Sequence, residues 1–271
     1  MMSESPVAIV TGASRGIGAA TAEEFGRRGY RVTLAARTRS DLDQVALRVQ
    51  AAGGEALVLD GDLSDLKFTE SIAKRTVEQF GQIDVLVNNA AWREITTMRD
   101  ISIESWERTL RISLTSPAFL AKWSAAFMET RKRGVIINIS SVQSTRASGI
   151  APAYIACKGA LDALTSDLSV LYGPRGIRVV CINPGAIDTE MSGDYESSDG
   201  QSITAQLRES SEDRISLRRW GRPEEMAKTI AWMASDDASY ITGTTLLADG
   251  GLASQFGPYK INQLMFPKDF S

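Results

Sequence analysis

The sequence contains no histidine among its 271 residues. Histidine is the base of Ser–His–Asp triads and of Cys–His nucleophile pairs, and it is the commonest metal ligand in proteins. The absence excludes those mechanisms, and we expect no metal site. Any acid–base chemistry must use another side chain.

Cysteine and long apolar runs are also scarce. The two cysteines, Cys157 and Cys181, form no CxxC pair, so we expect reduced thiols in a reducing compartment. Residues 1–6 show no secretion signal. No apolar run approaches the roughly 18 residues that a membrane-spanning helix needs. We therefore predict a cytoplasmic protein without a membrane partner.

Basic charge is not in excess. The chain has 30 Lys and Arg against 33 Asp and Glu, and its formal net charge is −3. Because affinity for nucleic acid depends on Lys and Arg meeting phosphates, we expect no nucleic-acid partner. With 43% hydrophobic residues, the chain can bury a sizeable core.

Short apolar segments alternate with longer amphipathic ones. The strand-like segments are residues 7–11, 31–36, 56–59, 83–87, 135–139, 178–182 and 244–247. The helical segments are residues 18–28, 42–51, 67–80, 103–131 and 152–172. This alternation is typical of a parallel sheet covered on both faces. We predict an α/β fold: one doubly wound domain over residues 1–251, with a seven-stranded parallel sheet and helices on both faces.

Two segments interrupt this rhythm. Residues 188–216 are polar and precede a helix that is predicted to begin at Pro223. A long polar insertion after a strand often forms an active-site lid, and a plain surface loop is the alternative. Residues 252–271 form an apolar and aromatic tail, which we expect to dock on the body or on a neighbouring subunit.

A glycine-rich segment, TGASRGIG at 11–18, follows the first strand and opens a helix. Glycines there let backbone N–H groups approach a pyrophosphate. The second strand ends at Ala36 and Arg37, without the acid that would bind an adenosine ribose and repel a 2′-phosphate. Arg15 and Arg37 are expected to bind that phosphate, which favours NADP(H) over NAD(H). The alternative is that both are solvated surface arginines.

Further motifs follow in a fixed order. They are Asp62-Leu63, Asn88-Asn89-Ala90, Ser141, Tyr154-Ile155-Ala156-Cys157-Lys158, Asn183-Pro184-Gly185 and Asp249-Gly250-Gly251. With the glycine-rich segment, they make the sequence resemble the short-chain dehydrogenase/reductase family over residues 5–251. The resemblance implies a Rossmann-like domain and hydride transfer between a nicotinamide cofactor and a small-molecule alcohol or carbonyl. It also implies a homotetramer formed through the helices at 103–131 and 152–172.

The cofactor contacts that the glycine-rich segment and the resemblance imply cover much of the chain. They are Gly12, Ser14, Arg15, Gly16, Ile17, Gly18, Arg37, Asp62, Leu63, Asn89, Ala90, Tyr154, Lys158, Pro184, Gly185, Ile187 and Thr189.

Tyr154 and Lys158 lie four residues apart on a predicted helix and so share one face. A free tyrosine is a poor base at neutral pH, but a nearby ammonium and an oxidised nicotinamide ring stabilise its phenolate. Tyr154 is therefore predicted to be the acid–base catalyst, and Ser141 is predicted to orient the substrate oxygen. For the Tyr–Lys pair alone, a surface contact is the alternative.

Two positions depart from the family pattern. Ser113 stands where the family has an asparagine that anchors a water of the proton relay, and we predict that Ser113 takes this catalytic role. Ala91 stands where glycine is common, and its methyl group is expected to crowd the backbone. These departures keep open a cofactor-binding protein with little turnover.

The loops at the carboxyl ends of the strands are predicted to form the wall of the substrate pocket. Trp92, Glu94, Ser141 and Gln143 are its predicted contacts, and they suit a sugar or polyol. Residues 239–252 are also similar to glucose 1-dehydrogenases. Because 3-oxoacyl-carrier-protein reductases share part of that region, a 3-oxoacyl thioester remains the alternative substrate.

Overall fold

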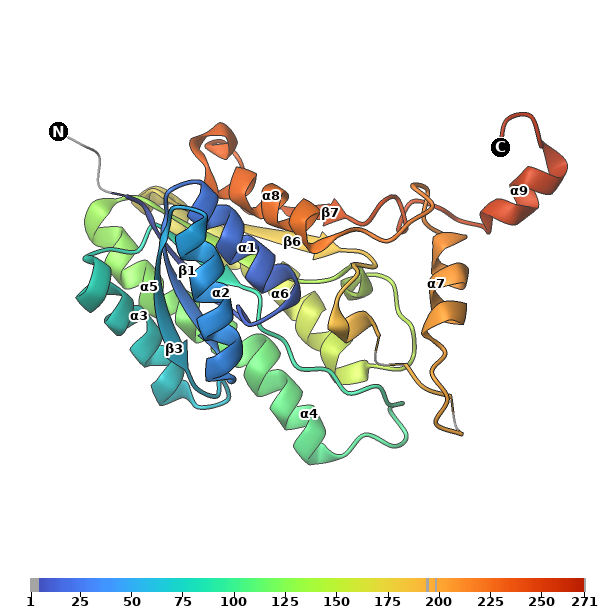
Figure 1. Ribbon diagram of the computed structural model, residues 1–271, viewed down its shortest axis with the longest axis horizontal. Helices are drawn as coiled ribbons and strands as arrows, with labels where there is room; N and C mark the ends of the chain where they lie inside the picture. Colours follow the sequence, from blue (N-terminus) through green and yellow to red (C-terminus); the bar gives the residue numbers. More distant parts are fainter. Residues whose placement is uncertain (1–4, 194, 198, 271) are drawn as a thin grey trace.

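The computed structural model describes residues 5–193, 195–197 and 199–270. In this part of the chain, seven parallel strands form one sheet in the order β3-β2-β1-β4-β5-β6-β7 (Figure 1). The strands are β1 Val7–Thr11, β2 Arg31–Ala36, β3 Glu55–Asp60, β4 Val85–Asn88, β5 Gly134–Ile139, β6 Ile177–Pro184 and β7 Thr245–Ala248. The predicted seven-stranded parallel sheet is confirmed.

Helices cover both faces of the sheet. One apolar cluster joins the sheet to α1 (Gly16–Arg27), α2 (Arg39–Ala51) and α8 (Pro223–Ala234). The other joins it to α3 (Leu66–Phe80), α5 (Ser116–Arg131) and α6 (Pro152–Tyr172). Alternate residues of the central strands β1, β4 and β5 face opposite clusters, so these strands are apolar on both faces, whereas the edge strands β3 and β7 are partly exposed.

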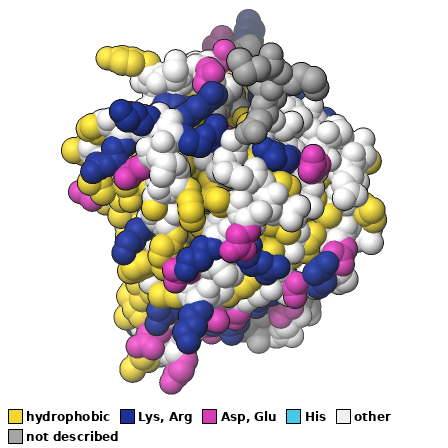
Figure 2. All heavy atoms as spheres, turned by 90° about the vertical axis from the view of Figure 1, so that its left-hand side faces the viewer, with side chains coloured by type: hydrophobic (Ala, Val, Ile, Leu, Met, Phe, Trp, Pro, Cys, Tyr) yellow, Lys and Arg dark blue, Asp and Glu magenta, His cyan; other side chains and the backbone are white. Residues whose placement is uncertain are grey.

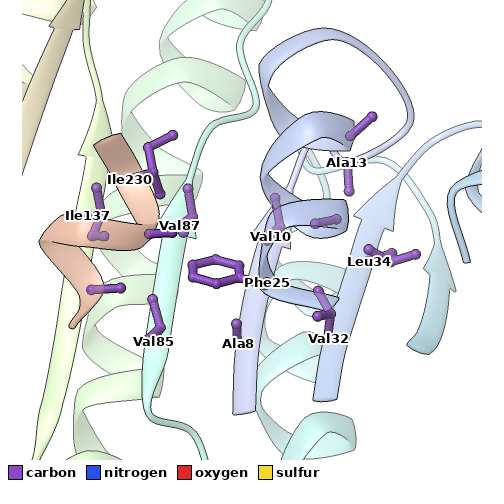
Figure 3. Packing of buried hydrophobic residues seen from close by; sticks show 14 of the residues in the cluster. Ala8, Val10, Ala13, Phe25, Val32, Leu34, Val85, Val87, Ile137 and Ile230 are labelled. Atoms are coloured by element: carbon purple, nitrogen blue, oxygen red, sulfur yellow. The ribbon is translucent and has the colours of Figure 1, made fainter. Parts of the chain in front are cut away.

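Phe25 shows how the first cluster fixes α1. Its ring is fully buried and lies over Ala8 and Val10 of β1 and close to Val85 of β4 (Figure 3). Burial of one such side chain contributes roughly 2–3 kcal/mol. This packing fixes the last turns of α1 on the sheet.

The predicted helix over 103–131 is three elements. They are α4 (Ile103–Leu110), a π-helical turn (Arg111–Thr115) and α5. Pro117 has no N–H to donate to the carbonyl of Ser113, so the regular hydrogen-bond ladder is interrupted there. The helical spacing of the sequence did not reveal this one-turn change.

The described residues of the polar segment 188–216 include two short helical elements. They are a 3₁₀ turn (Glu190–Ser192) and the helix α7 (Thr204–Glu212). No residue of α7 is buried, so the sequence carries no apolar periodicity that would predict this helix. That this segment closes over a site remains a prediction.

The C-terminal tail projects from the body and ends in α9 (Tyr259–Met265) (Figure 1). Lys260 pairs with Glu209 at 2.9 Å, and the Arg218 guanidinium carbon lies 4.4 Å from the centroid of the Tyr259 ring. Phe256 and Leu264 are exposed. The tail therefore contacts the body near α7, and the Ala253 carbonyl also accepts a hydrogen bond from Arg146 at 2.6 Å, while these two apolar side chains stay uncovered. That they dock on a neighbouring subunit remains a prediction.

Charged side chains of both signs are interspersed on the side of the molecule where the chain enters β1 (Figure 2). Ion pairs near the starts of the strands include Arg131 with Asp84 at 2.8 Å and Arg175 with Glu129 at 3.3 Å. No helix within the described ranges is long and apolar enough to cross a membrane.

Candidate active site

A cavity of about 490 Å³ opens at the carboxyl ends of the strands. Its wall comes from the loops after β1, β2, β3, β4, β5 and β6. The order of the strands reverses between β1 and β4. Ligands of doubly wound sheets bind at this switch point, so the fold itself places the site here.

The loop after β1 is shaped to receive an anion. Gly12 and Gly16 have positive φ angles of 63° and 54°, which favour glycine. No side chain caps the first turn of α1, and no acid lies in it. By contrast, the Asp65 carboxylate accepts a hydrogen bond at the start of α3. The backbone N–H groups at the start of α1 are therefore available to a phosphate.

Gly18 has a different role from the other two glycines. A Cβ atom at Gly18 would lie 2.2 Å from the Gly12 carbonyl oxygen and 2.6 Å from the Asn89 amide nitrogen. Gly18 does not line the cavity, but its missing side chain lets α1 approach the loop. The Asn89 side-chain amide nitrogen donates hydrogen bonds to the carbonyls of Thr11 (2.9 Å) and Gly12 (3.2 Å), which ties the loop after β4 to the glycine-rich loop.

The other predicted cofactor residues are brought together in one wall. They are Gly12, Ser14, Arg15, Gly16, Ile17, Arg37, Asp62, Leu63, Asn89, Ala90, Tyr154, Lys158, Pro184, Gly185, Ile187 and Thr189. Asp62 accepts a hydrogen bond from the Ser64 backbone N–H, which lowers the pKa of its carboxyl group. Asp62 is therefore a charged acceptor at neutral pH.

Arg15 and Arg37 are exposed at the edge of this wall. Within the described residues, no ion pair joins either guanidinium to an acid. Arg39, two positions further on, differs because it pairs with Asp43 at 2.8 Å and with Asp60 at 3.3 Å. The two cavity arginines thus keep their charge available for a ligand.

Tyr154 and Lys158 meet as predicted. Both are buried on α6, and the Lys158 ammonium lies 5.3 Å from the centroid of the Tyr154 ring. The ammonium donates to the Ile139 carbonyl at 2.6 Å. Ser141 lies two residues after the end of β5, and its hydroxyl accepts a hydrogen bond from the Gln143 N–H at 3.1 Å. These three predicted catalytic side chains share the cavity wall.

Ser113 is engaged elsewhere. Its hydroxyl accepts from the Trp92 N–H at 3.0 Å and donates to the Trp92 carbonyl at 3.2 Å. It is buried and does not line the cavity. Ser113 therefore holds the loop after β4, and its part in a proton relay stays a prediction.

Ala91 fits its place. The described non-glycine residues with positive φ are Lys132 and Arg218, so Ala91 adopts an ordinary backbone conformation. The backbone at this position therefore does not need glycine, and crowding of a bound cofactor by the methyl group stays a prediction.

Three of the four predicted substrate contacts, Trp92, Ser141 and Gln143, line the cavity. Glu94 does not: its carboxylate accepts a hydrogen bond from the Ser105 hydroxyl on α4 and lies outside the wall. Glu94 turns away from the cavity because the buried Ser105 hydroxyl in the first turn of α4 offers its carboxylate a hydrogen-bond partner.

Several wall residues were not singled out from the sequence. They are Tyr195, Leu207 and Ser211 inside the predicted lid, Trp220 after it and Leu252 at the start of the tail. The Trp220 ring N–H donates to the Ser211 hydroxyl at 2.6 Å, which holds α7 against the cavity. The only signal for them was the long polar insertion after the sixth strand.

Neither cysteine offers a nucleophile. Burial raises the pKa of the Cys157 thiol to about 11 and that of the Cys181 thiol to about 12. Both thiols therefore stay protonated at neutral pH. Within the described ranges, no group of three His, Cys, Asp or Glu side chains could hold a metal ion.

Comparison with known proteins identifies relatives over nearly the whole chain. Residues 12–253 match the family model described as Enoyl-(Acyl carrier protein) reductase. The chain is 34% identical to Glucose 1-dehydrogenase 2 of Bacillus subtilis, over 90% of this chain and 93% of that protein. It is 35% identical to 3beta-hydroxysteroid dehydrogenase 1 of Eggerthella lenta, over 90% and 92%. It is 34% identical to Cis-4-hydroxycyclohexanecarboxylate dehydrogenase of Sinomonas cyclohexanicum, over 90% and 95%.

Solved structures agree with these relatives. A putative short-chain alcohol dehydrogenase from Sinorhizobium meliloti 1021 superimposes with a TM-score of 0.87 at 29% identity, covering 93% of this chain and 97% of that one. A short-chain type dehydrogenase/reductase from Mycobacterium marinum gives a TM-score of 0.84 at 30% identity, covering 92% and 96%.

Proposed function

Since the chain belongs to the short-chain dehydrogenase/reductase family, we propose that it interconverts an alcohol and a carbonyl with NADP(H), using Tyr154 as the acid–base catalyst. The observation that carries the proposal is the buried Lys158 ammonium beside the Tyr154 ring, at a cavity that Ser141 also lines. Its relatives include several dehydrogenases, which supports oxidoreduction.

The wall fits a nicotinamide dinucleotide. The start of α1 offers N–H groups to a pyrophosphate, and Arg15 and Arg37 offer cations to a 2′-phosphate. The Lys158 ammonium has three N–H donors, of which one meets the Ile139 carbonyl, so donors remain for the hydroxyls of a nucleotide sugar. When bound, NADP(H) supplies or accepts the hydride.

The chain's own residues handle the proton. In the reducing direction, the Tyr154 hydroxyl donates its proton to the carbonyl oxygen as the carbonyl carbon receives the hydride. In the oxidising direction, the Tyr154 phenolate takes the proton from the alcohol. The Lys158 ammonium stabilises the phenolate by its charge, and the Ser141 hydroxyl donates a hydrogen bond that orients the substrate oxygen.

The decisive variant is Tyr154→Phe, with Tyr172→Phe as its control. Tyr172 is a buried tyrosine of the same helix that does not line the cavity. With NADPH and a panel of ketones, aldehydes and sugars, we expect Tyr154→Phe to lose about 10²- to 10⁴-fold in kcat. NADPH binding and the Tyr172→Phe rate should stay near wild type. A Tyr154→Phe rate close to wild type contradicts the mechanism.

The carbon skeleton of the substrate is a separate part of the proposal. The relatives are named for glucose, a hydroxysteroid and a hydroxycyclohexanecarboxylate, which are three different chemistries. The polyol hypothesis used Glu94, which lies outside the cavity. Trp92, Leu207 and Trp220 give the wall apolar surface there. A secondary alcohol on a mainly apolar frame is therefore favoured over a sugar, and glucose and a 3-oxoacyl thioester belong in the substrate panel.

The competing function is that of a protein that binds the cofactor but turns over little substrate. Tyr154, Lys158 and Ser141 lie together in the cavity wall, and a protein that only bound the cofactor would not need all three.

We also propose a homotetramer formed through α5 and α6, where Phe119 and Val170 are exposed. Light scattering of the purified protein tests the assembly.

A further inference from the structure

Arg93 lies between the Tyr154 ring and the segment after β6. Its guanidinium carbon is 5.9 Å from the centroid of the Tyr154 ring and 5.3 Å from that of Tyr195. It donates to the Met191 carbonyl at 2.7 Å and to the Tyr195 hydroxyl at 3.2 Å. Arg93 is half-buried and lines the cavity. A cation therefore faces the place where the substrate must meet the catalytic tyrosine.

No acid of the described residues pairs with this cation. Among the described residues, the acids that line the cavity are Asp41, Asp62 and Glu190. Asp41 and Asp62 follow β2 and β3 on the cofactor side of the wall. The Glu190 carboxylate lies 3.8 Å from the place where a Cβ atom of Gly16 would be, so it faces the glycine-rich loop. Within the described part of the chain, no acid therefore compensates the positive charge at the substrate end.

Holding the lid does not by itself account for a guanidinium. Arg178, a structural arginine, donates to three backbone carbonyls, those of Met233, Ser235 and Ile241. Arg93 donates to one carbonyl and one phenol, so three of its five N–H groups are unused by described residues. A neutral amide could make the same two bonds without the cost of partly burying a charge. The remaining donors suit the planar, paired oxygens of a carboxylate.

We propose that Arg93 binds a carboxylate of the substrate, so that the enzyme acts on a hydroxy acid and its oxo acid. The inference rests on the proposed function and names its substrate class. The guanidinium lies close to Tyr154, which calls for a compact acid with few carbons between carboxylate and carbonyl. Trp92 and Trp220 provide apolar surface for those carbons.

The test compares a matched pair of ketones, 4-oxocyclohexanecarboxylate and its neutral primary amide, with NADPH. A charge-assisted hydrogen bond predicts a kcat/KM about 10- to 100-fold higher for the acid. Arg93→Gln removes the charge and is expected to abolish this preference. Arg99→Gln is the control, because Arg99 belongs to the same loop but does not line the cavity. It is expected to keep the preference.

A second measurement needs no turnover. Titration of the NADP⁺ complex with cyclohexanecarboxylate and cyclohexanecarboxamide, followed by tryptophan fluorescence, should show at least tenfold tighter binding of the acid, lost in Arg93→Gln. If this preference appears but no ketone is reduced, the carboxylate site stands and the proposed function fails. If ketones are reduced without a preference for the acid, the proposed function stands and the carboxylate site is overturned.

Two further outcomes also overturn the proposal. Arg93→Gln could lower activity equally on the acid and on the amide, which would assign the guanidinium to holding Met191 and Tyr195 only. Asp194, next to Tyr195 in the sequence, lies outside the described residues. If the preference for the acid emerges only in the Asp194→Asn variant, the anion that pairs with Arg93 in the wild-type protein is the Asp194 carboxylate and not a substrate carboxylate.

Discussion

Replacing Arg37 by alanine is expected to weaken NADPH binding about tenfold and to leave NADH binding unchanged. Arg37 follows β2 at the edge of the cavity, and no acid of the described residues pairs with it. NADH lacks the 2′-phosphate, so only the phosphorylated cofactor gains from this guanidinium.

The magnitude follows from the exposure of the side chain. A hydrogen bond to a charged group contributes about 1.5–3 kcal/mol where it is shielded from water. Arg37 is exposed, so screening by solvent reduces this to about 1.4 kcal/mol, which corresponds to about tenfold in affinity. The double variant with Arg15→Ala should approach a hundredfold if the two sites act independently.

Energy transfer from tryptophan to the reduced nicotinamide measures both affinities directly, because Trp92 and Trp220 line the cavity. Titrations at rising salt should narrow the difference between NADPH and NADH, since an exposed phosphate contact is screened. Arg39→Ala is the control: that guanidinium already pairs with Asp43 and Asp60, so the cofactor preference should persist.

Equal losses of NADPH and NADH affinity in Arg37→Ala would refute the reasoning. They would mean that the side chain supports the loop and does not recognise the phosphate. Tighter NADH binding by the wild-type protein would refute the NADP(H) preference itself.

Three further outcomes follow from the structure. Hydrogen bonds from Arg219 hold the pKa of Glu225 at about 2, below its ordinary value of 4.5, so the ionised carboxylate stabilises the fold above that ordinary value and this stabilisation is lost as pH falls towards 2. Because the pair is largely solvated, Glu225→Gln should lower the free energy of unfolding by about 1 kcal/mol at pH 7 and by nothing near pH 2, as urea unfolding across pH will show. Gly18→Ala places a methyl group against a backbone carbonyl and should cost about 1–3 kcal/mol or more with loss of cofactor binding, while Gly173→Ala, which meets open space, should not; thermal unfolding separates the two, and equal melting points would contradict the packing role. Both thiols are buried, with pKa values of about 11 and about 12, so iodoacetamide at pH 8 should label them only in denaturant, and mass spectrometry showing rapid labelling of the folded protein would contradict this.

Sequence reasoning succeeded where a local pattern determines the structure. The glycine-rich loop is expected to follow β1 and open α1, because glycines at that turn allow a tight bend and a close approach of the backbone to a pyrophosphate. Tyr154 and Lys158 are one helical turn apart, so they share a face in any helix, and the structure brings both to the cavity. Such features depend on neighbours in the chain.

The failures concern contacts that no local pattern encodes. Glu94 precedes α4 by several residues, and its partner Ser105 is revealed only when the loop folds back onto that helix. The Ser113 hydroxyl meets the Trp92 backbone through an equally remote contact. The wall residue Trp220 lies beyond an insertion whose helix α7 has no buried residue to mark it.

The cavity wall divides along the chain. Groups assigned to the cofactor lie mainly on the loops after β1, β2, β3 and β4, which are tied to the sheet and to α1. The segment after β6 contributes to both ends: Ile187 and Thr189 are assigned to the cofactor, whereas Tyr195, Leu207 and Trp220 line the proposed substrate side. These last three residues, like Leu252, lie outside the two buried clusters. Substitutions there can change the cavity without disturbing the packed core, so a lineage built on this scaffold can acquire new substrates while it keeps the groups around α1.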